Sequence, residues 1–556
     1  MAVQQGLSHI FLLFSCLCVR MEEMQFCGIL LERQGDRYRV RKDDRHRVRK
    51  DVKMRELVHF ERTVEELVCF VEDTKPNEVV GATYIKLRSG ISSSALLEAA
   101  ALAVSRSTDL PHSHHGGPVH PVSGLYAIAH LAERNSGLDS FLPVIQSVAL
   151  ANKHIHSPDM GSTAMTRVMS SDLEQLSKDD LLNGFSVALE KRMAPLAERH
   201  LVALLKTASP DEILDAMLQI AIPRNALDDH YFLYTVYAFR ALDVVGWKHA
   251  EVILRPPVRF LCRHPMLEYG EGERGKIIQE GISLYTKFSD LENLIEIYSL
   301  DKADLAIDTS MKETGAIKAL AEEVSNIRKI SETPALVAQK LAGGLSVMGV
   351  LEGLSVGGAM RFIRSNTGNP FDVHMHTGIS ARRYLLSLPG LSHRTRLLLL
   401  MSWGQGYEIR HLDRTLVWDL NTNSNDIDDA SQDDLLGAIV DSLEGQPIFD
   451  LASLTGSIAE VVAPESVLET TALAQHYVEL GYDPKPFFEL MAQHVCRDDQ
   501  SEMHAYKMQQ ATYEEFYKTR DELRGLHLVA AAKHAATVAR LNPRTIYPKT
   551  RALMAD

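Results

Sequence analysis

A histidine and a lysine that can both take part in metal chemistry lie three residues apart in "EMHAYKMQQ" (residues 502 to 510). This spacing places His504 and Lys507 on one face of a helix, so both can meet the same object. Imidazole is the commonest metal ligand in proteins. A lysine is a poor ligand while protonated, but burial beside a cation lowers its pKa. The neutral amine can then add carbon dioxide and become a carbamate, which is an anionic oxygen ligand.

Lys507 can also be an ordinary lysine that binds no metal. Long lysine side chains commonly extend to solvent, and a nearby carboxylate such as that of Glu502 could pair with the ammonium. The sequence leaves both interpretations open at this point.

Three further helical stretches open, or nearly open, with a histidine as the stretch at His504 does. The four stretches are "HPVSGLYAIAHLAER" from His120, "HYFLYTVYAFRALDVVG" from His230, "HMHTGISARRYLLSL" from His374 and "HAYKMQQATYEEFYKTR" from His504. A second helical stretch follows each of them: "LDSFLPVIQSVALA", "WKHAEVILRPPVRFL", "SHRTRLLLLMSW" and "GLHLVAAAKHAATVA". Four such hairpins would build a bundle whose imidazoles converge at one end. Four imidazoles suit iron, zinc, copper or nickel better than magnesium or calcium.

Other histidines compete for these places. They are His112, His114 and His115 in "PHSHHGGPVHP", His154 and His156 in "KHIH", His376 in "HMH" and His249 in "GWKHAEVILR". Residues two apart on a helix point to different sides, so at most one member of each such pair is expected to bind the metal. We expect His249 to be a supporting or structural residue.

The elements that must position these side chains are helices. Apolar residues recur at spacings of three and four through most of the chain, and alternating strand patterns are scarce. We predict an all-α fold, a multi-helical bundle built from helical hairpins, as one large domain or two tightly packed subdomains. Residues 1–55 are expected to be a disordered extension or a start codon placed too early, 56–420 the first part of the core, 435–545 the part that completes the site, and 546–556 a tail.

Charge and cysteine content narrow the class of protein. The net charge of −14 disfavours nucleic acid as a partner, although "DRYRVRKD" and "DRHRVRKD" (36 to 51) form a local basic tandem repeat. A membrane-spanning helix needs about 20 apolar residues, and no such run free of charge occurs, so no membrane is expected. Cys262 and Cys496 lie far from the other four cysteines, which is no disulfide framework and no zinc ribbon. A reducing, cytoplasmic location follows.

Four segments carry a resemblance to a known family. "LDDHYFLYTVYAFRALDVVGWKHAEVILR", "DVHMHTGISARRYLL", "CRDDQSEMHAYKMQQATYEEFYKTR" and "LHLVAAAKHAA" resemble the questin oxidase-like proteins, over about residues 90 to 540. These are oxygenases of aromatic polyketide pathways, with bacterial relatives sometimes fused to a Rieske domain. The resemblance implies a mononuclear non-heme iron, held by four histidines and a carboxylated lysine in members that cleave an anthraquinone ring. The matching residues here are His120, His230, His374, His504 and Lys507.

The implied activity is an Fe(II)-dependent oxygenase that uses O2 on an aromatic or polyketide-type ketone, by Baeyer–Villiger-like or ring-cleaving oxidation. His376 or His249 is the expected general base. The chain departs from the Rieske-fused relatives, because "CRH" (262 to 264) is a lone Cys-x-His. Electrons are therefore expected from the substrate or, through a separate reductase, from NAD(P)H.

Two other classes stay open. A non-catalytic helical scaffold or interaction protein predicts no bound metal and histidines scattered in space. A zinc-dependent hydrolase is disfavoured because the chain has no HExxH motif, and "HLD" (411 to 413) is the nearest approach to a His-Asp pair.

Overall fold

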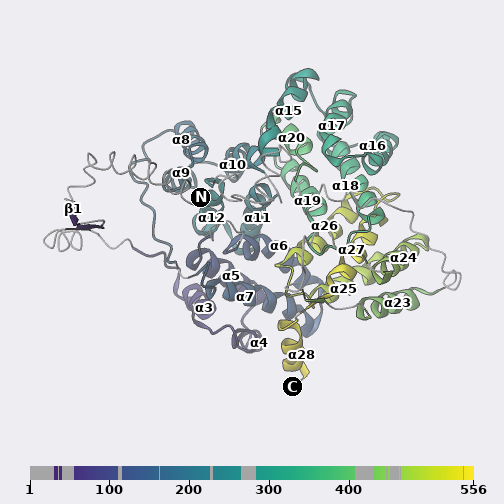
Figure 1. Ribbon diagram of the computed structural model, residues 1–556, viewed down its shortest axis with the longest axis horizontal. Helices are drawn as coiled ribbons and strands as arrows, with labels where there is room; N and C mark the ends of the chain where they lie inside the picture. Colours follow the sequence, from purple (N-terminus) through teal and green to yellow (C-terminus); the bar gives the residue numbers. More distant parts are fainter. Residues whose placement is uncertain are drawn as a thin grey trace, which may run out of the picture. The chain divides into compact units, whose positions relative to one another are not determined.

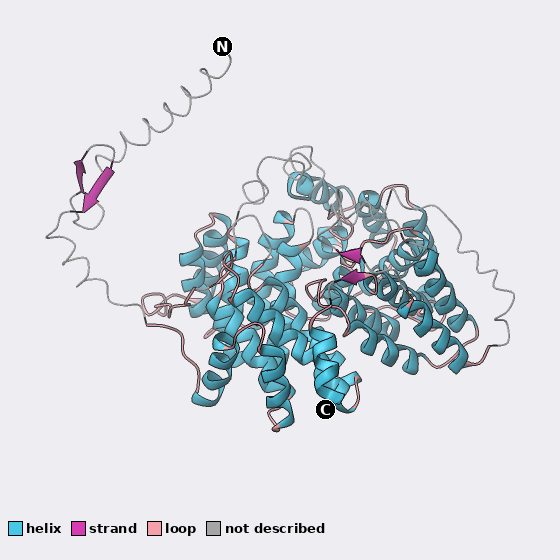
Figure 2. Ribbon diagram, turned by 60° about the horizontal axis from the view of Figure 1, so that its bottom comes forward, coloured by secondary structure: helices cyan, strands magenta, loops and turns pink. Residues whose placement is uncertain are grey.

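The described part of the chain is all-α, as the apolar periodicity predicts (Figure 2). The computed structural model describes residues 31–34, 37–40, 56–110, 116–161, 163–225, 229–263, 284–406, 413, 430–445, 449–450, 463, 465–542 and 544–555. None of the helices in these ranges is long and apolar enough to cross a membrane.

The chain divides into two compact units, residues 1–57 and 58–556. In the first, strands β1 (Leu31–Gln34) and β2 (Arg37–Val40) pair antiparallel. The rest of the expected N-terminal extension, through residue 55, lies outside the described residues. The second unit holds both expected parts of the core and the expected tail.

The first half of the second unit is a succession of helices. They are α3 (Arg62–Asp73), α4 (Val79–Arg88), α5 (Ser93–Ser107), α6 (Val119–Arg134), α7 (Phe141–Ile155), α8 (Lys178–Glu190), α9 (Ala194–Leu204), α10 (Pro210–Arg224), α11 (His230–Val245) and α12 (Ala250–Leu261). Short 3-10 turns join some of them, at Gly137–Ser140 and Trp247–His249.

The second half continues in the same way. Its helices are α15 (Leu284–Ile297), α16 (Thr314–Asn326), α17 (Thr333–Ala342), α18 (Val347–Arg364), α19 (His374–Leu386), α20 (His393–Met401), α23 (Gln432–Glu444), α24 (Glu465–Glu479), α25 (Pro484–Val495), α26 (His504–Lys518), α27 (Gly525–Val538) and α28 (Ile546–Ala555). Further 3-10 turns lie at Leu300–Lys302, Met311–Glu313 and Ile330–Glu332. Strands β3 (Phe449–Asp450) and β4 (Leu541–Asn542) form a short parallel pair. The expected tail forms α28, which packs on α4 and α7.

The four helices that open with a histidine are neighbours in space. Helix α6 packs on α11 and α26, and α19 packs on the same two helices, so the four close into a ring near the centre of Figure 1. Each also packs against the helix expected to be its hairpin partner: α6 on α7, α11 on α12, α19 on α20, and α26 on α27. Segments more than a hundred residues apart in sequence therefore share one four-helix core.

These four helices begin differently from many of the others. Helices such as α5, α8 and α10 begin with a serine whose hydroxyl accepts a hydrogen bond from a backbone N–H of the first turn, which stabilises the helix end. No side-chain cap of this kind is made at the start of α6, α11, α19 or α26. Imidazoles occupy these four helix ends instead.

Candidate metal centre

The four helix-opening imidazoles lie together at one end of the ring of helices. The ring centroids of His120 and His230 are 5.0 Å apart, those of His230 and His374 5.4 Å, those of His374 and His504 5.4 Å, and those of His504 and His120 4.9 Å. Across the group, the centroids of His230 and His504 are 6.1 Å apart. Each imidazole therefore has two imidazole neighbours, and the four surround a common centre.

Three of the four come closest to the spacing of metal ligands. One nitrogen each of His120, His230 and His504 lies within 4.8 Å of the other two. Nitrogen ligands sit about 2.0–2.1 Å from a zinc-sized ion, so two ligands on opposite sides are about 4 Å apart. Such a spacing is compatible with one ion in contact with all three nitrogens, and His374 on α19 brings a fourth imidazole to the group.

Burial and the helix ends both favour the neutral imidazole. The four residues are only 3 to 7% exposed. His230, His374 and His504 are the first residues of their helices and His120 is the second residue of α6, where the positive end of the helix dipole disfavours a positively charged ring. Burial holds the pKa of His504 well below its usual value, and the charge of Lys507 and the rings of His374 and His230 lower it further. A neutral imidazole has the lone pair that a metal ion needs.

One hydrogen bond fixes the tautomer of His504. Its Nδ1 lies 2.7 Å from the backbone carbonyl oxygen of Ser501. Because a carbonyl only accepts, Nδ1 carries the hydrogen in the neutral ring and Nε2 carries the lone pair. A hydrogen bond from the second ring nitrogen to a carbonyl is the usual support of a metal-binding histidine.

Lys507 lies one turn after His504 on α26 and is buried, with 5% of its surface exposed. Its charge lowers the pKa of His504. The structure therefore places Lys507 on the same helix as His504 and buries its side chain, which does not extend into solvent.

The backbone is strained just before two of the four histidines. Asp229, directly before His230, has φ of 60°, and Glu502 and Met503, before His504, have φ of 48° and 67°. Non-glycine residues rarely adopt this left-handed region, and such strain gathers at functional sites. At residues 502 and 503 it turns the chain sharply into α26.

Glu502 lies beside the histidine group, whereas the sequence offered it only as an ion-pair partner of Lys507. Its Oε2 is 3.4 Å from Nε2 of His120, and its Oε1 is 4.0 Å from Nε2 of His154. Nδ1 of His154 lies 2.6 Å from the carbonyl oxygen of Gly117, so His154 is held by the loop before α6. No local motif marks Glu502, because its place follows from the two left-handed residues and not from a helical spacing.

A buried polar layer lies further along the same four helices. The guanidinium of Arg240 on α11 donates to Ser380 Oγ on α19 (3.0 Å) and to Glu514 Oε1 on α26 (2.7 Å), and it stacks 3.6 Å over the ring of Tyr126 on α6. Each helix thus contributes one residue. Tyr126 and Ser380 each follow their histidine by six positions, and Arg240 and Glu514 by ten, so the ring of helices has an approximate two-fold repeat.

The two predicted general bases lie elsewhere. His376 packs edge-on against Phe362, with ring centroids 5.2 Å apart, and burial lowers its pKa to about 3. Nε2 of His249 lies 2.6 Å from Glu98 Oε1, and its ring packs against Phe60. The structure does not bring either ring into the four-histidine group, and His249 packs between Glu98 and Phe60.

Of the other candidates that the structure describes, His154 lies beside Glu502, and His156 does not join the group. His156 is exposed at the end of α7. The loop that contains His112, His114 and His115 lies outside the described residues, as does His411 of "HLD".

Comparisons of the chain with protein-family models, with curated proteins and with solved structures find no match.

Proposed function

We propose that the protein is a mononuclear non-heme iron oxygenase that acts on an aromatic ketone. The observation that supports it best is the meeting of four buried imidazoles from the ends of four different helices. His120, His230, His374 and His504 would hold the metal, and Lys507, once carboxylated, would add the anionic oxygen. Iron(II) bound there would supply the activation of O2.

The protein's own residues would set the conditions for this chemistry. The helix ends that disfavour imidazolium also favour an anion, so a carbamate in the first turn of α26 would be stabilised by the same dipole. The carbonyl of Ser501 would hold the ring of His504 in one orientation. Burial of all four rings would keep bulk water away from the reacting groups.

The electron balance depends on how many oxygen atoms enter the product. Insertion of one atom of O2, with reduction of the other to water, takes two electrons, which NAD(P)H could supply through a separate reductase. Ring cleavage that incorporates both atoms takes no external electrons.

A zinc-dependent hydrolase is the second candidate, because one nitrogen each of His120, His230 and His504 lies within 4.8 Å of the other two, a set that could hold an ion without His374. Three protein ligands and an open position for water are typical of catalytic zinc sites. The identity of the bound metal separates the two candidates.

The test is elemental mass spectrometry on protein purified without oxygen and without a histidine tag. We expect stoichiometric iron in the wild type, its loss in His504→Ala, and reduced iron in Lys507→Ala. His130→Ala is the matched control: it lies on α6 but bonds to Glu133 at the surface, so its iron content is expected to stay unchanged. Labelling with ¹³C-bicarbonate should give a carbamate NMR signal that Lys507→Ala lacks.

Two outcomes would contradict the proposal. A folded wild type that contains no metal would leave the helical scaffold as the better account. Stoichiometric zinc, retained after iron is supplied, would favour the hydrolase.

A further inference from the structure

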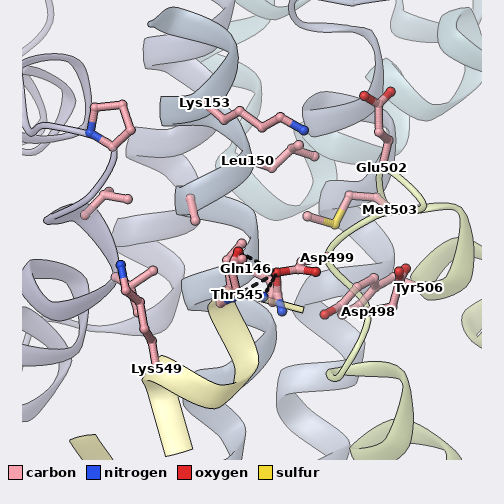
Figure 3. Close-up of a pocket in the computed structure, with 15 residues that line it drawn as sticks. Gln146, Leu150, Lys153, Asp498, Asp499, Glu502, Met503, Tyr506, Thr545 and Lys549 are labelled. Carbon is pink, nitrogen blue, oxygen red and sulfur yellow. Dashed lines mark hydrogen bonds between the residues drawn. The ribbon is translucent and has the colours of Figure 1, made fainter. Parts of the chain in front are cut away.

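A cavity of about 190 Å³ lies beside the histidine group (Figure 3). It is bounded by α4, by α7, by the segment 498–503 that leads into α26, and by the start of α28. An apolar cavity of about 150 Å³ holds one benzene molecule. This cavity therefore has room for one ring with small substituents.

Its walls are of two kinds. The apolar wall is formed by Pro76, Val79, Val80, Ala149, Leu150 and Met503. In Figure 3 the ammonium of Lys153 and the carboxylate of Glu502 lie at one end of the cavity, and Asp498, Asp499 and Thr545 lie at the other. A ring-shaped ligand with one polar end would match this division.

The acidic pair at the far end is already used by the protein. Asp499 Oδ2 accepts hydrogen bonds from the backbone N–H of Thr545 (2.7 Å) and of Ile546 (2.8 Å) and so caps the start of α28. Asp498 Oδ1 accepts from the backbone N–H groups of Gln500 and Ser501. These carboxylates hold the backbone and do not need a ligand.

The two lysines that line the cavity, Lys153 and Lys549, differ in their contacts with the protein. Lys549 Nζ donates to the carbonyl oxygen of Asn77 at 3.3 Å. Among the described residues no carboxylate lies within 4.0 Å of Lys153 Nζ, whose side chain is exposed and reaches the end of the cavity near Glu502. Lys153 is thus the cation that this cavity offers to a ligand.

Glu502 joins the cavity to the histidine group. It lines the cavity, and its carboxylate oxygens lie 3.4 Å from His120 and 4.0 Å from His154. Glu502 therefore contacts His120 and also forms part of the wall of the cavity that contains Lys153. The left-handed backbone at Glu502 and Met503 holds both side chains in the cavity wall.

We propose that this cavity binds a monocyclic aromatic anion, with its carboxylate or phenolate on Lys153 and its ring against Val80, Leu150 and Met503. This inference rests on the proposed function, because it assigns the cavity as the substrate-binding site of the oxygenase. It narrows that function to single-ring substrates.

Calorimetric titration tests the inference with two probes of the same shape, 2-hydroxybenzoate and the neutral 2-hydroxybenzamide. The wild type is expected to bind the anion about tenfold more tightly, as a charge-assisted hydrogen bond would give. Lys153→Met should remove this preference. The matched control is Lys549→Met, which lines the same cavity and should keep the preference. Ala149→Phe fills the cavity and should weaken the binding of both probes.

Several outcomes would overturn the inference: no binding of 2-hydroxybenzoate by the wild type, a preference that survives in Lys153→Met, or full binding by a folded Ala149→Phe. If Ala149→Phe fails to fold, Lys153→Met still decides. Iron is measured on the same samples. Lysine-dependent binding in protein that never holds metal supports the cavity and counts against the oxygenase, whereas iron-loaded protein that binds neither probe counts against the cavity alone.

Discussion

Asp229, Glu502 and Met503 hold their backbones in the left-handed region, although none of them is glycine. Each such residue costs about 1–3 kcal/mol and persists only where the surrounding structure requires it. Arg192 shares this conformation, with φ of 59°, but is exposed and far along the chain from the four histidines. A substitution at Arg192 therefore measures the energetic cost of the strain alone, and one at Met503 measures its effect on the histidine group.

We expect Arg192→Gly to raise the free energy of unfolding by about 1 kcal/mol, because glycine adopts positive φ without strain. Met503→Gly relieves the same strain but removes a buried side chain, and loss of a buried methionine costs about 2–5 kcal/mol. It should therefore lower stability and metal content. Urea unfolding and elemental analysis measure both effects. A Met503→Gly variant that is more stable and fully loaded would show that the strain has no connection with the site.

At the scale of helices, two glycines mark the approximate two-fold repeat. Gly124 follows His120 by four positions, and Gly378 follows His374 by four. A Cβ on Gly124 would lie 2.6 Å from Cβ of Met503, the residue before α26, and a Cβ on Gly378 would lie 3.6 Å from a carboxylate oxygen of Asp229, the residue before α11. Gly124 therefore lets α6 approach the start of α26 closely, whereas the contact of a Cβ on Gly378 with Asp229 is an ordinary van der Waals contact.

Gly124→Ala tests this close approach. The added methyl group must displace Met503, and with it the start of α26, so we expect weaker metal binding and lower stability. The control is Gly437→Ala in α23, where a Cβ meets nothing within 4 Å. This substitution should raise the free energy of unfolding by about 1 kcal/mol, because alanine favours the helix over glycine. Thermal unfolding and metal titration compare the two. Unchanged metal affinity in Gly124→Ala would show that α26 can shift without harm to the group.

The helical hairpins and the meeting of their histidines follow from local sequence patterns. Apolar spacing predicts the helices, and a histidine at the start of each predicts a common end once the helices pack side by side. Glu502 could not be found in this way, because left-handed residues place it. The layer around Arg240 could not be found either, since its partners Ser380 and Glu514 lie on other helices more than a hundred residues away and no spacing links them. His376 was predicted as a base from nearness in sequence, but two residues along a helix turn it to another side.

For the whole molecule, buried neutral histidines predict sensitivity to acid. Burial lowers the pKa of His494 and His527 to about 3 and that of His534 to about 4, against 6.5 in the unfolded chain. Between pH 6.5 and 4 the unfolded chain therefore binds more protons than the folded one, so stability is full above pH 6.5 and falls as the pH falls. Uptake of one proton by each of the three histidines on unfolding gives the free energy of unfolding a slope of up to about 4 kcal/mol per pH unit.

Denaturant unfolding at a series of pH values measures this slope. His527→Asn should lower it by about 1.4 kcal/mol per pH unit, the contribution of one proton. A stability that does not change between pH 6.5 and 4 would contradict the neutral burial of these rings.

The first of the four imidazoles is at residue 120 and the last at residue 504, and this separation has a consequence for synthesis of the protein. Translation adds about 5–20 residues per second, so roughly 20 to 80 s separate the first of these side chains from the last. Throughout that interval the nascent chain carries an incomplete set. A metal ion held by all four can be acquired only after α26 has left the ribosome and docked, and a chain that stops before it has no complete site.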